Sequence, residues 1–136
     1  MTPNELMQKA IQAMQQSYSP YSHYRVGAAL LSRDGRVFTG CNIENAAYSP
    51  TVCAERCAFF KAVSAGVRDF EAIAVVGSRE GGEPTGAPPC GVCRQVMAEF
   101  CDADSFKIYL MGKSGEIVCH TLGELLPSGF GKGNLG

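Results

Sequence analysis

Two short segments carry the chemistry of this sequence: Cys53-Ala54-Glu55 and Pro89-Cys90-Gly91-Val92-Cys93. Together they supply three thiols that can hold one Zn²⁺ and a carboxylate two positions after the first thiol. Three protein ligands on a tetrahedral ion leave the fourth position for water, which distinguishes a catalytic zinc site from a closed structural one. A carboxylate beside that position can accept and redistribute the protons that the water gives up. The pattern therefore favours hydrolytic chemistry at a zinc ion.

A Cys-x-x-Cys pair alone leaves other interpretations open. Cys90 and Cys93 are also compatible with a redox pair, half of a structural zinc site, or two buried cysteines. A structural site needs a fourth Cys or His, for which Cys57 is a candidate. If Cys53 and Cys57 share a helix, however, Cys57 lies one turn further along, on the packed face. Glu55 favours the catalytic interpretation, because a structural zinc site does not need it.

Length and composition predict one globular domain, residues 1–136. Hydrophobic residues make up 46% of the chain and charged residues 18%, which argues against general disorder. The net charge of −1 offers no basic excess for binding a nucleic acid polymer. No stretch approaches the ~20 apolar residues of a membrane helix, and the segment from Met1 to Glu5 lacks a signal-peptide pattern. We therefore expect a cytoplasmic protein with reduced thiols that acts on a small molecule, with neither nucleic acid nor membrane as a partner.

Periodicity and turn residues predict an α/β fold. The expected helices cover residues 3–17, 54–65, 91–101 and 122–126, and the expected strands cover residues 24–31, 36–41, 72–76, 106–111 and 116–119. Asp34-Gly35 is a hairpin turn signal, and residues 42–52 and 78–89 are expected to be irregular. The link 112–115 is too short for a crossover, so the last two strands should be antiparallel. This order predicts a mixed five-stranded sheet with helices on its faces. Both thiol segments begin helices, where the partial positive charge favours thiolates.

The two segments also fit the signature of zinc-dependent nucleobase deaminases, H-x-E followed by P-C-x-x-C, in which Cys can replace His. Over nearly its whole length, the chain resembles the homotetrameric zinc-dependent cytidine deaminases of pyrimidine salvage. The resembling segments are Pro20-Tyr21-Ser22, Val26-Gly27-Ala28-Ala29, Gly40-Cys41-Asn42-Ile43-Glu44-Asn45-Ala46-Ala47-Tyr48, Cys53-Ala54-Glu55-Arg56, Pro89-Cys90-Gly91-Val92-Cys93-Arg94-Gln95 and Leu125-Leu126-Pro127. The resemblance implies the cytidine-deaminase fold, a three-layer α/β/α sandwich around a mixed five-stranded sheet. It also implies hydrolysis of cytidine and deoxycytidine to uridine and deoxyuridine with release of ammonia, and one Zn²⁺ per chain.

The same resemblance implies roles around the metal. The implied zinc ligands are Cys53, Cys90 and Cys93. Glu55 is the implied catalytic residue, which moves protons between water and the substrate. Three thiolates give the site a formal charge of −1, which weakens the pull of zinc on water. In the resembling enzymes an arginine at the position of Arg56 offsets this charge by donating to the sulfurs. Arg94 and Gln95 are further candidates for such contacts, and a solvated surface charge is the alternative for Arg94.

The implied substrate-binding residues are Tyr24, Asn42, Glu44, Ala54 and Phe130. In the resembling enzymes the positions of Asn42 and Glu44 bind the sugar, and an Asx-type turn is the alternative for both. Tyr24 stands where those enzymes often have Phe packed against the pyrimidine ring. Phe130 resembles a tail aromatic residue that reaches the pocket of a neighbouring subunit, although it is equally compatible with a cap on its own core.

Three other functions stay open: a deaminase of an aminonucleoside antibiotic such as blasticidin S, a polynucleotide deaminase, and a non-enzymatic zinc-stabilised interaction module. The segment Asn42-Ile43-Glu44-Asn45 and Arg56 favour nucleoside salvage over the antibiotic deaminase, which lacks these features. The charge balance disfavours the polynucleotide enzyme. Glu55 argues against the interaction module.

Two segments predict self-association. Residues 42–52 and 127–136 lack the apolar periodicity that would hold them on their own core, yet they carry Tyr48 and Phe130. The alternative is a surface loop and a frayed tail. In the resembling enzymes such segments cross subunit boundaries, so we expect a homotetramer.

Overall fold

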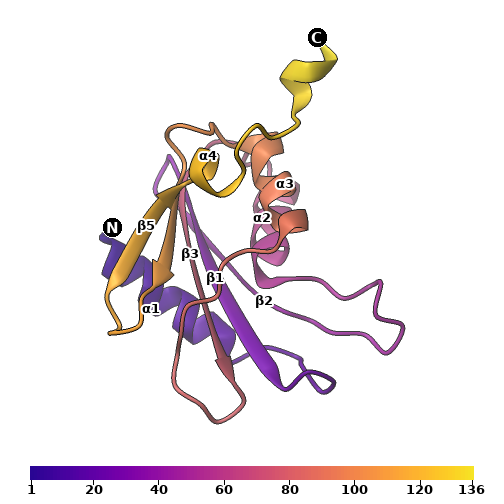
Figure 1. Cartoon of the computed structure of the whole chain (residues 1–136), viewed down its shortest axis with the longest axis vertical. Coiled ribbons are helices and arrows are strands. Elements are labelled where there is room, and N and C mark those ends of the chain that lie inside the picture. Colours follow the sequence, from indigo (N-terminus) through magenta and orange to yellow (C-terminus); the bar gives the residue numbers. More distant parts are fainter.

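The computed structural model describes residues 1–136 and contains one five-stranded sheet in the order β2-β1-β3-β4-β5 (Figure 1). The strands are β1 (Tyr24–Ser32), β2 (Val37–Cys41), β3 (Phe70–Arg79), β4 (Lys107–Met111) and β5 (Ile117–Thr121). The helices are α1 (Pro3–Met14), α2 (Ala54–Ser64), α3 (Gly91–Phe100) and the short α4 (Leu122–Leu125), and a 3-10 turn, η1 (Lys132–Leu135), ends the chain. Only β3 and β4 are parallel, with α3 in the crossover between them. The predicted mixed sheet with antiparallel last strands is confirmed.

Helices cover both faces of this sheet: α1 packs on one face, and α2 and α3 pack on the other (Figure 1). Alternating residues of β1 serve the two cores. Ala28 and Leu30 enter the core under α2 and α3, whereas Ala29 and Leu31 enter the core under α1. This follows because successive side chains of a strand point to opposite faces. The predicted three-layer α/β/α sandwich is therefore confirmed.

Two glycines allow the helices to lie directly on the sheet. A Cβ on Gly27 of β1 would lie 2.1 Å from the carbonyl oxygen of Ala10 in α1. A Cβ on Gly40 of β2 would lie 2.3 Å from the carbonyl oxygen of Ala54 in α2. Neither position has room for a side chain. The contact at Gly40 fixes the start of α2 and therefore also Cys53, the N-cap residue of that helix.

Some element boundaries differ from the predicted ones. Helix α1 ends at Met14 and not at residue 17, and β3 continues to Arg79 and not only to residue 76. The longer β3 arises because Ser78 pairs with Arg25 of β1, and the side chain of Ser78 is fully buried there. A serine does not extend a run of apolar residues even when it is buried, so the sequence pattern predicted a loop at residue 78. None of the helices combines the length and apolarity that a membrane span requires.

Candidate active site

Three cysteine thiols meet at the starts of two helices. Cys53 is the N-cap residue of α2, Cys90 is the N-cap residue of α3, and Cys93 lies in the first turn of α3. Their Sγ atoms lie within 4.8 Å of one another, with 3.7 Å between Cys53 and Cys90 and 3.5 Å between Cys90 and Cys93. Zn–S bonds of ~2.3 Å in a tetrahedron place sulfurs about 3.8 Å apart, so this donor set fits a zinc ion. Cys57, the alternative ligand, lies outside the cluster.

Arg56 supplies positive charge next to the thiols. Its Nη2 donates a hydrogen bond to Cys53 Sγ over 3.3 Å, which is the contact expected of a compensating charge. The pKa of the Cys53 thiol lies below its ordinary value, chiefly because the Cys93 thiol donates to it and also because Arg56 does, against the opposing effect of burial. A lowered pKa favours the thiolate, which is the form that binds zinc.

Glu55 is buried beside the thiols. Only 3% of the residue is exposed, and its Oε1 atom has no hydrogen-bond partner within the protein. Burial disfavours the charged form and raises the pKa of this carboxyl to about 7. Buried polar atoms are normally hydrogen-bonded, so an unpartnered carboxyl oxygen marks a place for a ligand or a water molecule. A carboxyl group with a pKa near neutrality can both accept and donate a proton.

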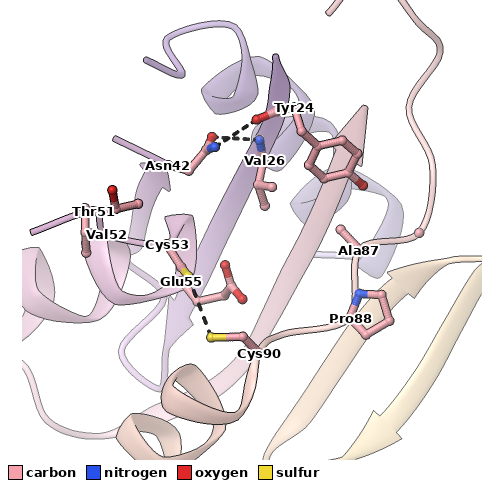
Figure 2. A pocket seen from close by; sticks show the side chains of 11 residues that line it. Tyr24, Val26, Asn42, Thr51, Val52, Cys53, Glu55, Ala87, Pro88 and Cys90 are labelled. Carbon is pink, nitrogen blue, oxygen red and sulfur yellow. Dashed lines mark hydrogen bonds between the residues drawn. The ribbon is translucent and has the colours of Figure 1, made fainter. Parts of the chain in front are cut away.

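A cavity of about 360 Å³ lies in front of Glu55 and the thiols (Figure 2). Its lining residues are Tyr24, Val26, Asn42, Thr51, Val52, Cys53, Glu55, Gly86, Ala87, Pro88 and Cys90. In Figure 2 the Glu55 carboxyl and the Cys90 thiol lie at one end of the cavity, and the Asn42 amide and the Tyr24 ring lie toward the other. This size, and a mostly apolar lining with few polar groups, suit a small organic ligand.

Comparison with known proteins identifies the family. The profile of the cytidine and deoxycytidylate deaminase zinc-binding region matches residues 1–109. The chain belongs to this family. It is 52% identical over 135 residues to a cytidine deaminase from Sporosarcina psychrophila, which covers 99% of this chain and 96% of that one. A cytidine deaminase from Halalkalibacterium halodurans is 55% identical over 125 residues, or 92% of this chain and 91% of that one. The crystal structure of cytidine deaminase from Burkholderia pseudomallei has a TM-score of 0.86 at 44% identity and covers 96% of this chain and 100% of that one.

Two of the deaminase's predicted substrate contacts, Tyr24 and Asn42, line the cavity. The side chain of Asn42 is bound to its neighbours: Oδ1 accepts from the Val26 N–H over 2.8 Å and also from Ser17 Oγ. Nδ2 donates to the Tyr24 carbonyl over 2.9 Å. The Asx-turn alternative is wrong for Asn42, because these partners lie in β1 and after α1. An amide nitrogen carries two N–H donors, so one of them stays available for a ligand.

The other three predicted substrate contacts do not line this cavity. Glu44 lies in an adjacent hollow, where its Oε1 accepts from the backbone N–H groups of Tyr21 and Ser22 over 3.0 and 3.1 Å. Ala54 is fully buried at the start of α2. Phe130 is 59% exposed in the C-terminal tail, which extends away from the sheet in Figure 1. The alternative role of Phe130 as a cap on its own core is therefore wrong.

Arg94 and Gln95 do not contact the thiols. Arg94 Nε donates to the Pro89 carbonyl oxygen over 2.7 Å, and its Nη1 donates to the Leu125 carbonyl oxygen over 2.6 Å. Gln95 Nε2 donates to the Phe130 carbonyl oxygen over 2.8 Å. The prediction that these side chains contact the sulfurs is wrong. The alternative of a solvated charge is also wrong for Arg94, because its guanidinium is half-buried and bound to two carbonyl groups.

The sequence pattern did not predict one wall of the cavity. Gly86, Ala87 and Pro88 form it, and Thr51 and Val52 add to the lining. The sequence predicted irregular backbone for these residues and no role in the site. Each group nevertheless directly precedes a ligand helix, and that position is a usable signal because such residues must lie close to the metal.

Proposed function

We propose that this deaminase hydrolyses cytidine and deoxycytidine to uridine and deoxyuridine with release of ammonia, a reaction of pyrimidine salvage. One observation carries the proposal: the unpartnered carboxyl oxygen of Glu55 is buried at the cavity, next to a cluster of three thiols. The relatives at 52% and 55% identity bear the name cytidine deaminase, which supports this substrate class.

Cys53, Cys90 and Cys93 would hold Zn²⁺, which supplies a Lewis acid that makes water nucleophilic at neutral pH. Glu55 takes the first proton that water gives up and delivers it to ring N3, which makes ring C4 electrophilic. The oxygen of water adds to C4, and the same carboxyl carries the second proton to the amino group. The C4–N bond then breaks, ammonia leaves, and C4 becomes a carbonyl carbon. The burial of Glu55 shields these proton transfers from other water molecules.

Within the cavity we assign the face of the pyrimidine ring to Tyr24 and the sugar to Asn42, whose free N–H can donate to a hydroxyl oxygen. Glu44 would accept from the sugar hydroxyls, since Thr51 lines both its hollow and the main cavity and joins the two. Ala54 would contribute its backbone N–H, because the first N–H groups of a helix lack intrahelical partners.

We further propose that the protein is a cytoplasmic homotetramer of single-domain chains. Two exposed aromatic side chains support the assembly: Tyr48 is 74% exposed and Phe130 is 59% exposed, and aromatic residues are enriched at subunit contacts. The free cysteines suit a reducing compartment. Light scattering should report four chains per particle, and Phe130→Ala should raise KM while shifting Tm little. A fully active monomer would contradict this assembly.

An ultraviolet assay tests the activity itself. The substrates are cytidine, deoxycytidine, their monophosphates, adenosine and blasticidin S, and zinc per chain is measured on the same sample. We expect turnover of the two free nucleosides with about one zinc per chain. Turnover of blasticidin S alone would instead establish the antibiotic deaminase.

Glu55→Ala, with Glu55→Gln as the variant of similar size, tests the proton carrier. Both variants should keep zinc and fold, and both should lose roughly 10²- to 10⁴-fold in kcat, which is the usual contribution of general acid–base catalysis. Near-normal turnover in either variant would refute the assigned role.

A further inference from the structure

The segment Gly86–Pro89 leads directly into Cys90 and forms a wall of the cavity. The only hydrogen bond that joins these four residues to the rest of the protein runs from Arg94 to the Pro89 carbonyl. Two of the four residues are prolines, which have no N–H to donate. The preceding anchor is the pair of backbone hydrogen bonds between Thr85 and Gly77 of β3. Between that anchor and the helix start, Arg94 alone fixes the backbone by hydrogen bonding.

The guanidinium of Arg94 is itself held in place. Its Nη1 donates to the Leu125 carbonyl at the end of α4, over 2.6 Å, while Nε faces Pro89. Hydrogen bonds from a charged donor are stronger than neutral ones, and the guanidinium holds its donors in one rigid plane. The two carbonyl groups therefore stand in a fixed relation to each other and to α3.

Cys90 is the thiol that most needs such support. Cys93 is buried and Cys53 is half-buried, but Cys90 is exposed, so packing restrains it least. The ring of Pro89 fixes its own φ, and a bound carbonyl fixes the plane of the peptide that joins Pro89 to Cys90. The direction in which the Cys90 thiol approaches the cluster follows from that plane.

We propose that Arg94 is a positioning residue of the zinc site, which acts on Cys90 and on the cavity wall through the Pro89 carbonyl. The proposal rests on the proposed function only in taking Cys90 as a zinc ligand. Loss of the contact should loosen one ligand and one wall together. Partners behind metal ligands typically change metal affinity about 10- to 100-fold when removed, so we expect zinc release to accelerate within that range. KM should rise as well, because the wall of Gly86, Ala87 and Pro88 then keeps only its anchor at Thr85 and loses the one next to Cys90.

The test uses Arg94→Gln, Arg94→Lys and a matched control, Arg68→Gln. Arg68 is exposed and makes no side-chain hydrogen bond or ion pair, so the control removes the same charge without a contact. Zinc release from the loaded full-length protein into a chromogenic chelator gives the rate. The absorption spectrum of the Co²⁺-substituted protein reports the geometry of the sulfur ligands. Neither measurement needs a substrate.

A positioning role of Arg94 and a purely electrostatic role predict different results for the Arg94→Lys variant. Lysine keeps the charge but lacks the planar fork that reaches two carbonyl groups, so Arg94→Lys should release zinc almost as fast as Arg94→Gln. Both should have an altered cobalt spectrum, and Arg68→Gln should match the parent protein. Parent-like release and spectrum in Arg94→Gln would overturn the proposal, as would full recovery in Arg94→Lys. If Arg94→Gln does not fold, the lysine variant decides alone. Either failure leaves cytidine turnover by the parent enzyme, and hence the proposed function, untouched.

Discussion

Substitution of Gly40 in β2 by alanine should damage the active site by displacing the start of α2. The new Cβ would lie 2.3 Å from the Ala54 carbonyl oxygen, 2.7 Å from the Ala58 nitrogen and 2.8 Å from Cys57 Cβ. Two of these three atoms are backbone, so rotation of a side chain cannot relieve the overlap. Restoring ordinary contact distances of ~3.5 Å moves the start of α2 by roughly 1 Å.

That displacement has two measurable costs. Overpacking of this kind typically destabilises a domain by about 1–3 kcal/mol, which lowers Tm by roughly 3–15 °C for a chain of this size. Cys53 is the N-cap residue of α2 and Glu55 lies in its first turn, so both residues move with the start of the helix. A misplacement of about 1 Å can cost roughly 10²-fold in rate, so kcat should fall by that order even where the variant is fully folded.

Gly27→Ala is the informative comparison. Its Cβ would meet the Ala10 carbonyl oxygen at 2.1 Å, an equally severe overlap, but against α1 on the opposite face of the sheet. Circular dichroism melts, zinc content and cytidine turnover are measured for both variants below their melting temperatures. Both should lose Tm, and only Gly40→Ala should lose kcat and zinc. Equal kinetic damage in the two variants, or parent-like kinetics in Gly40→Ala, would refute this account of how the sheet positions the site.

Three further substitutions test the metal centre. Cys53→Ala should lose zinc and activity, because two thiols hold the ion poorly, whereas Cys57→Ala should keep both. Metal analysis and an activity assay are carried out on both variants. Full zinc occupancy in Cys53→Ala would mean that the ligand set is wrong. Arg56→Gln should still bind zinc but turn over about 10- to 100-fold more slowly, since the Cys53 sulfur loses its 3.3 Å donor; an unchanged kcat would rule out charge compensation.

The sequence predicted those parts of the molecule whose signals are local. Cys53 and Cys90 each precede a run with helical pattern, so their place at helix starts could be inferred without coordinates. The order of helices and strands predicted a sheet with helices on its faces, and the short link before β5 predicted the antiparallel last strand pair. Such features depend on residues a few positions apart, so they can be predicted from the order of residues in the chain.

Contacts to backbone atoms could not be predicted in the same way. Arg94 was expected to reach a sulfur, but its partners are the carbonyls of Pro89 and Leu125, and a carbonyl has no residue type that would reveal it. Ser78 extends a buried strand although it is polar, because its place is set by pairing with Arg25. Glu44 was expected at the cavity, yet its carboxylate binds the turn at Tyr21 and Ser22. In each case the tertiary partner outweighs the local pattern.

The motif and its placement are therefore two separate determinants of the site. The motif supplies three thiols and one carboxylate, whereas Gly40 and Arg94 supply the contacts that hold the two ligand helices at their starts. Gly40 acts by having no side chain, and Arg94 acts on a carbonyl group, so neither touches a sulfur. A substitution at either position can consequently change the metal centre while every residue of the deaminase signature is intact, and a chain that matches the signature perfectly can still hold zinc poorly.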